Sequence, residues 1–107
     1  MEEERCAYAK LEGPEFRAYI TSLRVVLGRR SKDADFIHVS DEKVVSREHA
    51  VIEWDFEQAS FKITCRGRNG ITVNLKKLDP DSPSVLLYSG SPIRIGTVCF
   101  YFLLPAK

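Results

Sequence analysis

The amino-acid sequence predicts an all-β domain with a sandwich architecture. Its apolar segments alternate with a period of two more often than with the 3.6-residue period of an amphipathic helix. Most of these segments are rich in β-branched and aromatic residues, and short clusters of Gly, Pro, Asn, Asp and Ser separate them. Many short strands at such regular spacing are typical of a sandwich or a barrel.

The alternating segments give the expected strands in chain order. They are residues 16–21, the apolar run that ends in Gly28-Arg29-Arg30, and residues 50–55, 60–65, 70–75 and 97–104. One helix competes with this assignment, because Ser46 could cap a helix over residues 46–58. The apolar residues there include positions 50, 52, 54 and 56, which fit one face of a strand better. We therefore expect a strand after residue 49.

Length and composition indicate one soluble domain. The 107 residues match the size of a single domain, so we expect one unit over residues 1–107 with a core over about residues 6–104. No apolar run approaches the roughly 20 residues that cross a bilayer, and the acidic start has no secretory pattern. We expect an intracellular location. The formal net charge of +1 argues against a dedicated duplex-DNA binder.

The cysteines and histidines predict neither disulfides nor a metal site. Cys6, Cys65 and Cys99 are an odd number without a CxxC pair. Together with His38 and His49 they show no usual metal-ligand spacing. Cys65 and Cys99 lie within apolar strand patterns, so we expect both to be small buried thiols.

Basic residues gather in the segments between predicted strands. These residues are Arg29, Arg30, Lys32, Lys43, Arg47, Arg66 and Arg68, with Ser46 and Asn69 as neutral hydrogen-bonding groups. Loops collect at the two ends of a sandwich, so segments far apart in sequence can face one another. Guanidinium groups and a hydroxyl suit a phosphate monoester, which carries about two negative charges and three acceptor oxygens. Phosphate is therefore the ligand class these residues indicate.

Each of these residues also has a purely structural interpretation. Loop arginines are usually solvated, and a serine such as Ser46 is usually a turn or cap residue. Asn69-Gly70 alone is a tight-turn dipeptide. His49 falls between a strand and its polar loop, where a hydrogen-bonding brace is a better expectation than a catalytic base. The phosphate-binding interpretation depends on the clusters occurring together.

Four short motifs occur in one order: Gly28-Arg29, Ser46-Arg47-Glu48-His49, Asn69-Gly70 and Val73-Asn74. This order resembles that of forkhead-associated (FHA) domains, with their GR, SxxH, NG and VN motifs. Residues 86–102 are similar to the closing strands of that family. The stretches YAKLEG and GRNG look most like the branch found in forkhead transcription factors and related nuclear proteins.

The resemblance implies an eleven-stranded β-sandwich that binds phosphothreonine in partner proteins through loops at one end. It implies phosphate contacts for Arg29, Ser46 and Arg47, and a contact from Asn69 to the peptide main chain. Structural support is implied for Gly28, His49, Gly70 and Asn74. It also implies a nuclear transcription or signalling protein.

The sequence departs from the family pattern at three positions. Arg68 replaces a small hydroxylic residue, and we expect its charge to reach the phosphate or an acidic flanking residue. Leu75 stands where a glycine is usual, and Ser91 where an aspartate is common. The last two changes concern turn shape more than recognition.

Catalysis is not expected. A cysteine phosphatase needs an arginine six positions after its thiolate, and Ile71 occupies that position after Cys65. No nucleotide-binding motif is present, and the Ser46–His49 pair has no evident carboxylate to orient it. We expect no cofactor and no small-molecule substrate. Two alternatives stay open: a phosphate-independent interaction module, alone or as a dimer, and a nucleic-acid binder that uses the same arginines.

Overall fold

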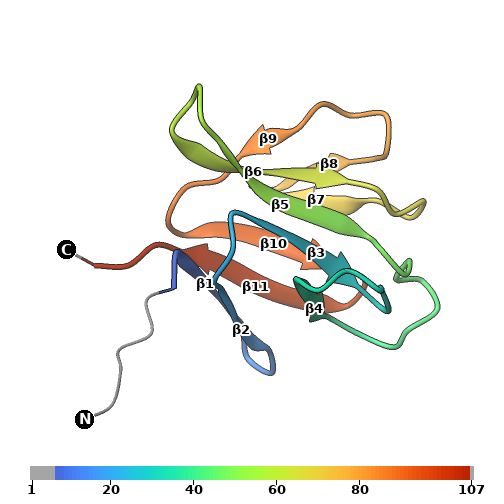
Figure 1. The fold of residues 1–107 in the computed structure, drawn as a ribbon. Helices are drawn as coiled ribbons and strands as arrows, with labels where there is room; N and C mark the ends of the chain where they lie inside the picture. The colour runs from blue at the N-terminus through green and yellow to red at the C-terminus, as the bar shows by residue number, and fades with distance from the viewer. Residues whose placement is uncertain (1–6, 107) are drawn as a thin grey trace, which may run out of the picture.

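The computed structural model describes residues 7–106 as two β-sheets packed face to face (Figure 1). It contains eleven strands: β1 Ala9–Glu12, β2 Arg17–Ile20, β3 Arg24–Gly28, β4 Phe36–His38, β5 Ala50–Asp55, β6 Ser60–Cys65, β7 Ile71–Val73, β8 Lys76–Leu78, β9 Val85–Leu86, β10 Ser91–Ile95 and β11 Val98–Leu103. The predicted eleven-stranded all-β sandwich is thus confirmed. The expected start of the core at residue 6, together with Cys6, lies outside the described residues.

The sequence pattern explains most of the strands. In β6 Phe61, Ile63 and Cys65 are buried, while the residues between them are partly exposed, as alternation predicts. The competing helix over residues 46–58 is absent, because Ala50 and Ile52 of β5 face the core. The expected strand over 70–75 is shorter than predicted and ends at Val73. In residues 7–106 no helix is long and apolar enough to cross a membrane.

The two sheets share one apolar core. The larger sheet has the order β2-β1-β11-β10-β7-β8 and contributes Leu11, Ile93 and Phe102. The smaller sheet has the order β4-β3-β5-β6-β9 and contributes side chains such as Leu27 and Ile52. Interdigitation of these inner faces holds the sandwich together.

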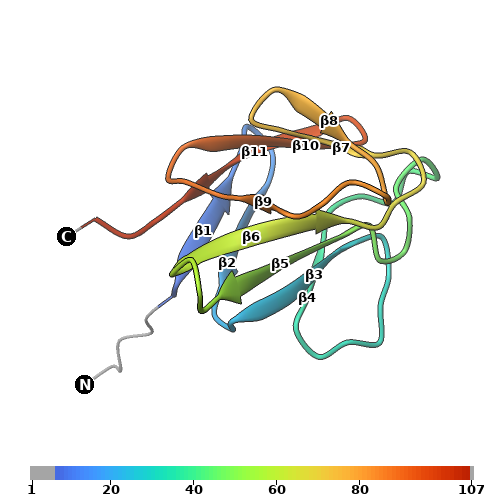
Figure 2. The same ribbon diagram turned by 90° about the horizontal axis from the view of Figure 1, so that it is seen from above.

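The topology brings several loops to one end of the sandwich. Ala50 at the start of β5 pairs with Leu27 of β3 on one side and with Cys65 of β6 on the other. The segments that follow β3, precede β5 and follow β6 therefore leave the sheet side by side. Figures 1 and 2 show these loops at the end opposite the two chain termini. This end contains the basic clusters found in the sequence.

Candidate functional site

His49 lies at the centre of the loop end and is fully buried. Its Nδ1 accepts a hydrogen bond from the backbone N–H of Ser46 at 2.8 Å, and its Nε2 lies 2.9 Å from the carbonyl oxygen of Gly70. A ring that accepts at Nδ1 and faces a carbonyl at Nε2 fits the neutral tautomer with the proton on Nε2. His49 therefore connects the β4–β5 loop (39–49) to the β6–β7 loop (66–70) and leaves neither nitrogen for catalysis.

Two glycines make room for this arrangement. A Cβ atom at Gly28 would collide with the carbonyl oxygen of Arg47, and one at Gly67 would collide with the imidazole of His49. The backbone carbonyl of His49 also accepts hydrogen bonds from Arg66 N and Gly67 N, at 2.8 and 2.9 Å. The absence of a side chain at both glycines lets the three loops pack against one another.

Arg29 is anchored to the β4–β5 loop by its main chain and its side chain. Its backbone N–H lies 3.1 Å from Ser46 O and 2.9 Å from Arg47 O, and its Nε donates to Val45 O at 2.9 Å. The terminal amino groups of its guanidinium have no hydrogen bond within the described part of the chain. These groups are therefore available to an anion.

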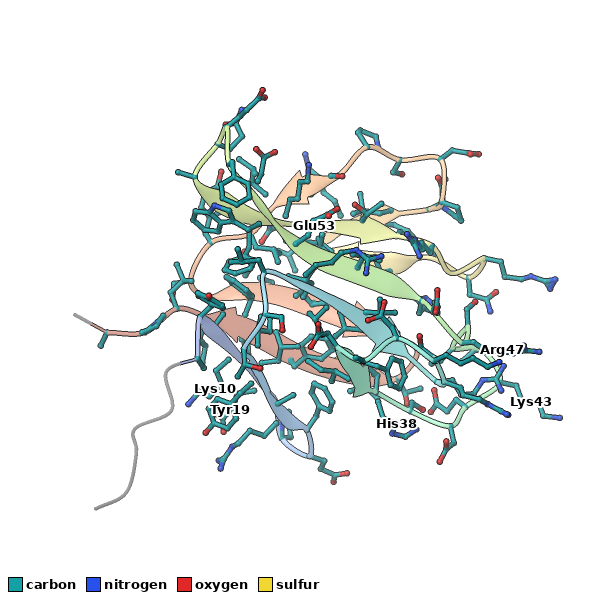
Figure 3. The ribbon with its side chains drawn as sticks, viewed as in Figure 1. Lys10, Tyr19, His38, Lys43, Arg47 and Glu53 are labelled. Atoms are coloured by element: carbon teal, nitrogen blue, oxygen red, sulfur yellow. The ribbon has the colours of Figure 1, made fainter. Side chains whose placement is uncertain are left out.

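The other predicted phosphate contacts are more exposed. The Arg47 side chain points out of the loop end, next to Lys43 (Figure 3). Arg68 is exposed as well, and among residues 7–106 its side chain forms no ion pair. Lys10 and Tyr19 lie away from this end (Figure 3). Arg29 and Ser46 are thus held together by the backbone, whereas the exposed side chains of Arg47 and Arg68 form no ion pair among residues 7–106.

Asn69 links the β6–β7 loop to the β4–β5 loop. Its Nδ2 donates a hydrogen bond to the carbonyl oxygen of Val44 at 2.9 Å. A side-chain amide has two N–H donors and a carbonyl acceptor, so this bond leaves one donor and the acceptor for a peptide main chain. The sequence suggested the contact to peptide but not the link to Val44.

The remaining predicted support residues, Gly70 and Asn74, lie at the end of the β6–β7 loop and in the β7–β8 turn. Gly70 has a φ of 78°, which favours glycine, and its carbonyl faces His49. Asn74, with a φ of 53°, occupies the β7–β8 turn, and its backbone N–H donates to Pro92 O at 3.0 Å. Ser91, in place of the family's aspartate, is buried and its Oγ accepts from Tyr88 N at 2.9 Å. A serine therefore still closes this turn.

Sequence reasoning missed a polar bridge that includes Glu48. The Glu48 carboxylate accepts from Ser31 Oγ at 2.6 Å and lies 3.5 Å from Nη1 of Arg66. It thus connects the β3–β4 loop (29–35) to the β6–β7 loop. The lone carboxylate in Ser46-Arg47-Glu48-His49 was a signal for this role, because it stands among basic residues. The bridge also gives Arg66 a partner other than ligand.

The β3–β4 loop is further fixed by Asp33. The backbone N–H of Asp35 donates to its carboxylate at 3.0 Å, and Arg24 lies 3.2 Å away. These two contacts, the backbone bond first, lower the pKa of Asp33 below its ordinary value. Asp33 therefore stays ionised and helps to order the loop that carries Arg29.

Of the two cysteines predicted to be buried, one is buried and the other is exposed. Cys65 is buried, and burial raises the pKa of its thiol, but Cys99 is exposed. The prediction for Cys99 is wrong because β11 alternates, which turns Phe100 and Phe102 inward and Cys99 outward. Within residues 7–106 no three His, Cys, Asp or Glu side chains lie close enough together to hold a metal ion.

Comparison with known proteins identifies the family. The family model described as "FHA domain" matches residues 25–96. Fork head protein homolog 1 of Saccharomyces cerevisiae is 35% identical over 116 residues, and this alignment covers 94% of the chain but 24% of that protein. Transcriptional activator FHA1 of Nicotiana tabacum is 36% identical over 104 residues, covering 94% of the chain and 50% of that protein. The chain thus spans half or less of the length of these relatives.

The fold comparison agrees. The N-terminal FHA domain of Saccharomyces cerevisiae RAD53P, solved in complex with a phosphothreonine peptide, superposes with a TM-score of 0.75. The two chains are 16% identical, and the match covers 92% of this chain and 94% of the other. FHA domains are recognition modules and not enzymes, in agreement with the sequence-based expectation. From the motif order, the loop geometry and these comparisons, the chain belongs to the FHA domain family.

Proposed function

We propose that the loop end binds phosphothreonine in a partner protein. The proposal is supported above all by the hydrogen bonds that hold Arg29. Three backbone carbonyls of the β4–β5 loop, one of them that of Ser46, hold its main chain and Nε, while its terminal amino groups remain available. A preorganised guanidinium next to a hydroxyl suits a phosphate, because it offers charge-assisted donors in a fixed direction.

The other loop residues extend this contact. Arg47 and Arg68 add positive charge from two different loops, and Asn69 donates to or accepts from the peptide main chain. Gly28, His49, Gly70 and Asn74 support the loops and do not touch ligand. His49 positions Ser46 through the hydrogen bond from the backbone N–H of Ser46 to Nδ1. Recognition thus combines Arg29, which the loop holds in place, with the exposed side chains of Arg47 and Arg68.

The expected affinity is modest. Hydrogen bonds to charged groups contribute roughly 1.5 to 3 kcal/mol each, and association with peptide ordering costs several kcal/mol. The balance corresponds to a Kd on the order of micromolar. A glutamate in place of phosphothreonine should bind poorly, since it has less charge and fewer acceptors.

A calorimetric titration tests the proposal with a phosphothreonine peptide selected from a library and its unphosphorylated twin. The phosphorylated peptide should bind and the twin should not. Equal curves would instead support the phosphate-independent interaction module. The surface of such a module would include Leu75 and Tyr88, which are large and exposed. Leu78 and Leu87 are buried and Leu86 is partly buried.

The nucleic-acid alternative makes a different prediction. A phosphodiester ligand would give a steep dependence of affinity on salt and no requirement for a phosphomonoester. A phosphothreonine ligand should lose affinity modestly below about pH 6, where its second ionisation reverses. Affinity that stays constant from pH 5 to pH 8 would contradict a dianionic ligand.

The cellular setting is also a proposal. We infer that the domain, spanning residues 1–107, is part of a nuclear transcription or signalling protein. Support comes from two relatives named as a fork head protein homolog and a transcriptional activator. Imaging of the tagged full-length protein tests this inference, and exclusion from the nucleus would contradict it.

A further inference from the structure

An apolar cavity of about 540 Å³ lies at the end of the sandwich away from the proposed phosphate site. Its volume falls within the range of about 300 to 1,000 Å³ that is usual for ligand pockets. β5 runs from the loop end to Asp55, so Trp54, which lines the cavity, lies about 17 Å along the strand from His49. Figure 1 shows the β5–β6 turn (56–59) at the end opposite the β4–β5 loop. The cavity is therefore separate from the phosphate-binding loops.

Aromatic rings form much of the wall of this cavity. The ring centroid of Phe61 lies 5.1 Å from that of Trp54, 5.8 Å from that of Phe102 and 6.3 Å from that of Tyr8. Phe61 and Phe102 are buried, whereas Trp54 is half-buried and Tyr8 is exposed. The rings thus form an apolar floor with an open rim, which suits an aromatic or large aliphatic side chain.

Exposed apolar side chains continue this surface beyond the cavity. Leu23 and Leu104 line the cavity and are 39% and 44% exposed. A hydrogen bond of 2.8 Å from the backbone N–H of Trp54 to the carbonyl of Leu23 holds these two residues together. Phe56 is 78% exposed, and its ring centroid lies 6.5 Å from that of Trp54. The cavity, Leu23, Phe56 and Leu104 together are called the Trp54 patch, and a contiguous apolar patch of this kind is typical of an interaction surface.

The unpaired charge beside the Trp54 patch is negative. Arg24 and Lys62 each follow a residue of the lining, but they pair with Asp33 at 3.2 Å and with Asp55 at 3.3 Å. Glu57, in the β5–β6 turn, is exposed and forms no ion pair within residues 7–106. Electrostatic complementarity therefore favours a partner with basic residues beside its apolar side chain.

A second copy of the chain fits this surface less well. Exchange of Phe56 between the cavities of two copies about a twofold axis would be reciprocal, as such interfaces require. It would also bring together the Glu57 side chains of the two copies, because Glu57 follows Phe56 in the same turn. Like charges at an interface oppose association, so the charge of this turn favours a different protein as the partner.

We propose that the Trp54 patch binds a partner protein through a segment in which Lys or Arg flanks one aromatic or large aliphatic side chain. The apolar side chain enters the cavity beside Trp54, and the basic residues lie near Glu57. An apolar anchor in a desolvated pocket supplies most of the affinity at many interfaces, whereas charges mainly select the partner. This site does not require phosphothreonine, so the domain can bind at both ends.

The test uses the fluorescence of Trp54, because it is the single tryptophan of the 107 residues. The first probe peptide is acetyl-Lys-Lys-Phe-Lys-Lys-amide. The second has Ala in place of Phe, and the third has Glu in place of every Lys. The first should change the Trp54 emission with a Kd on the order of millimolar, as expected for a single anchor. The Ala peptide should cause no change, and the Glu peptide should bind about three- to tenfold more weakly.

Variants connect this binding to the patch. Leu23→Ser/Leu104→Ser should weaken binding of the Lys-Phe peptide by roughly fivefold or more, since apolar contact area is lost. Leu75→Ser, at an exposed leucine of the β7–β8 turn, is the matched control and should bind as wild type does. Glu57→Gln should reduce the preference for the Lys peptide over the Glu peptide. Glu15→Gln changes an exposed glutamate of the β1–β2 turn and should keep that preference.

Each contrary result overturns a stated part of the proposal. The site is wrong if the Lys-Phe peptide leaves the Trp54 emission unchanged or if the Ala peptide binds equally. Equal affinity for the Lys and Glu peptides in wild type overturns the basic partner. Emission that changes with protein concentration alone, with dimers in sedimentation, assigns the patch to a second copy instead. All these measurements are made without phosphothreonine, so their failure leaves the proposed function intact.

Discussion

His49 shows how one buried polar residue can connect the loops of the proposed phosphate-binding end. Its two ring nitrogens are used by Ser46 N and Gly70 O, and its ring occupies the space left by Gly67. The sequence predicted the supporting role, because the residue falls between a strand and a polar loop. It could not predict the contact with Gly70, which lies 21 residues away and depends on how the sheets pair.

Replacing His49 should destabilise the fold. His49→Ala leaves a cavity and removes the partners of Ser46 N and Gly70 O, so we expect the free energy of unfolding to fall by about 2 to 4 kcal/mol. Thermal unfolding measures the change. His38→Ala is the control, because His38 is exposed and pairs with Asp41 at 2.9 Å. Equal losses in the two variants would contradict the central position of His49.

At the scale of elements, the β7–β8 hairpin contains a strained residue. Val73 pairs with Lys76, so Asn74 and Leu75 form a two-residue turn, and both have positive φ, 53° and 70°. That is the pattern of a type I′ turn, which prefers Asn-Gly. The sequence showed that a leucine replaces the usual glycine, but only the backbone shows the strain that follows.

Leu75→Gly should stabilise the protein. The Leu75 side chain is 85% exposed, so little packing is lost, whereas relief of its left-handed backbone conformation gains about 1 kcal/mol after the entropy of glycine is counted. We expect the midpoint of urea unfolding to rise. Leu75→Ala keeps the positive φ and should leave the midpoint nearly unchanged. A lower midpoint for Leu75→Gly would show that the turn is not strained.

The β5–β6 turn depends on the charge of Asp55. Its Oδ1 accepts from the backbone N–H of Gln58 at 3.0 Å and of Glu57 at 2.9 Å, and Lys62 lies 3.3 Å from Oδ2. Several contacts lower the pKa of Asp55 below its ordinary 3.8, and the hydrogen bond from the backbone of Gln58 has the largest effect. Its stabilising contribution is therefore present above about pH 4 and is lost as the pH falls through the lowered pKa.

The stability of Asp55→Asn should accordingly change less between pH 7 and acid pH than that of wild type. The variant should unfold at lower urea concentration than wild type at pH 7, and the difference should shrink toward pH 2. Asp81→Asn changes an exposed turn aspartate, whereas Asp55 is partly buried, and should follow wild type at both pH values. A difference between Asp55→Asn and wild type that stays constant with pH would contradict the assigned role of the carboxylate.

For the whole molecule, the sequence predicts more of the fold than of the candidate site. Period-two alternation located most strands, but β7 was overestimated because Asn74 and Leu75 continue the pattern into a turn. The carboxylate of Glu48 signalled a polar contact, but its partners Ser31 and Arg66 could not be predicted because they lie on loops distant in sequence. Motif order suggested that Arg29, Ser46 and Asn69 meet, and pairing of β5 with both β3 and β6 explains how their loops come together.

The central claim is that Arg29 and Ser46 form the phosphate-binding centre, and one titration series tests it most directly. A phosphothreonine peptide is titrated into wild type, Arg29→Ala, Ser46→Ala and the control Lys10→Ala, whose side chain lies away from the loops (Figure 3). Loss of charge-assisted hydrogen bonds predicts binding at least about tenfold weaker for Arg29→Ala and clearly weaker for Ser46→Ala, with the fold retained in both variants. Lys10→Ala should bind as wild type does, and wild-type affinity in Arg29→Ala would contradict the account.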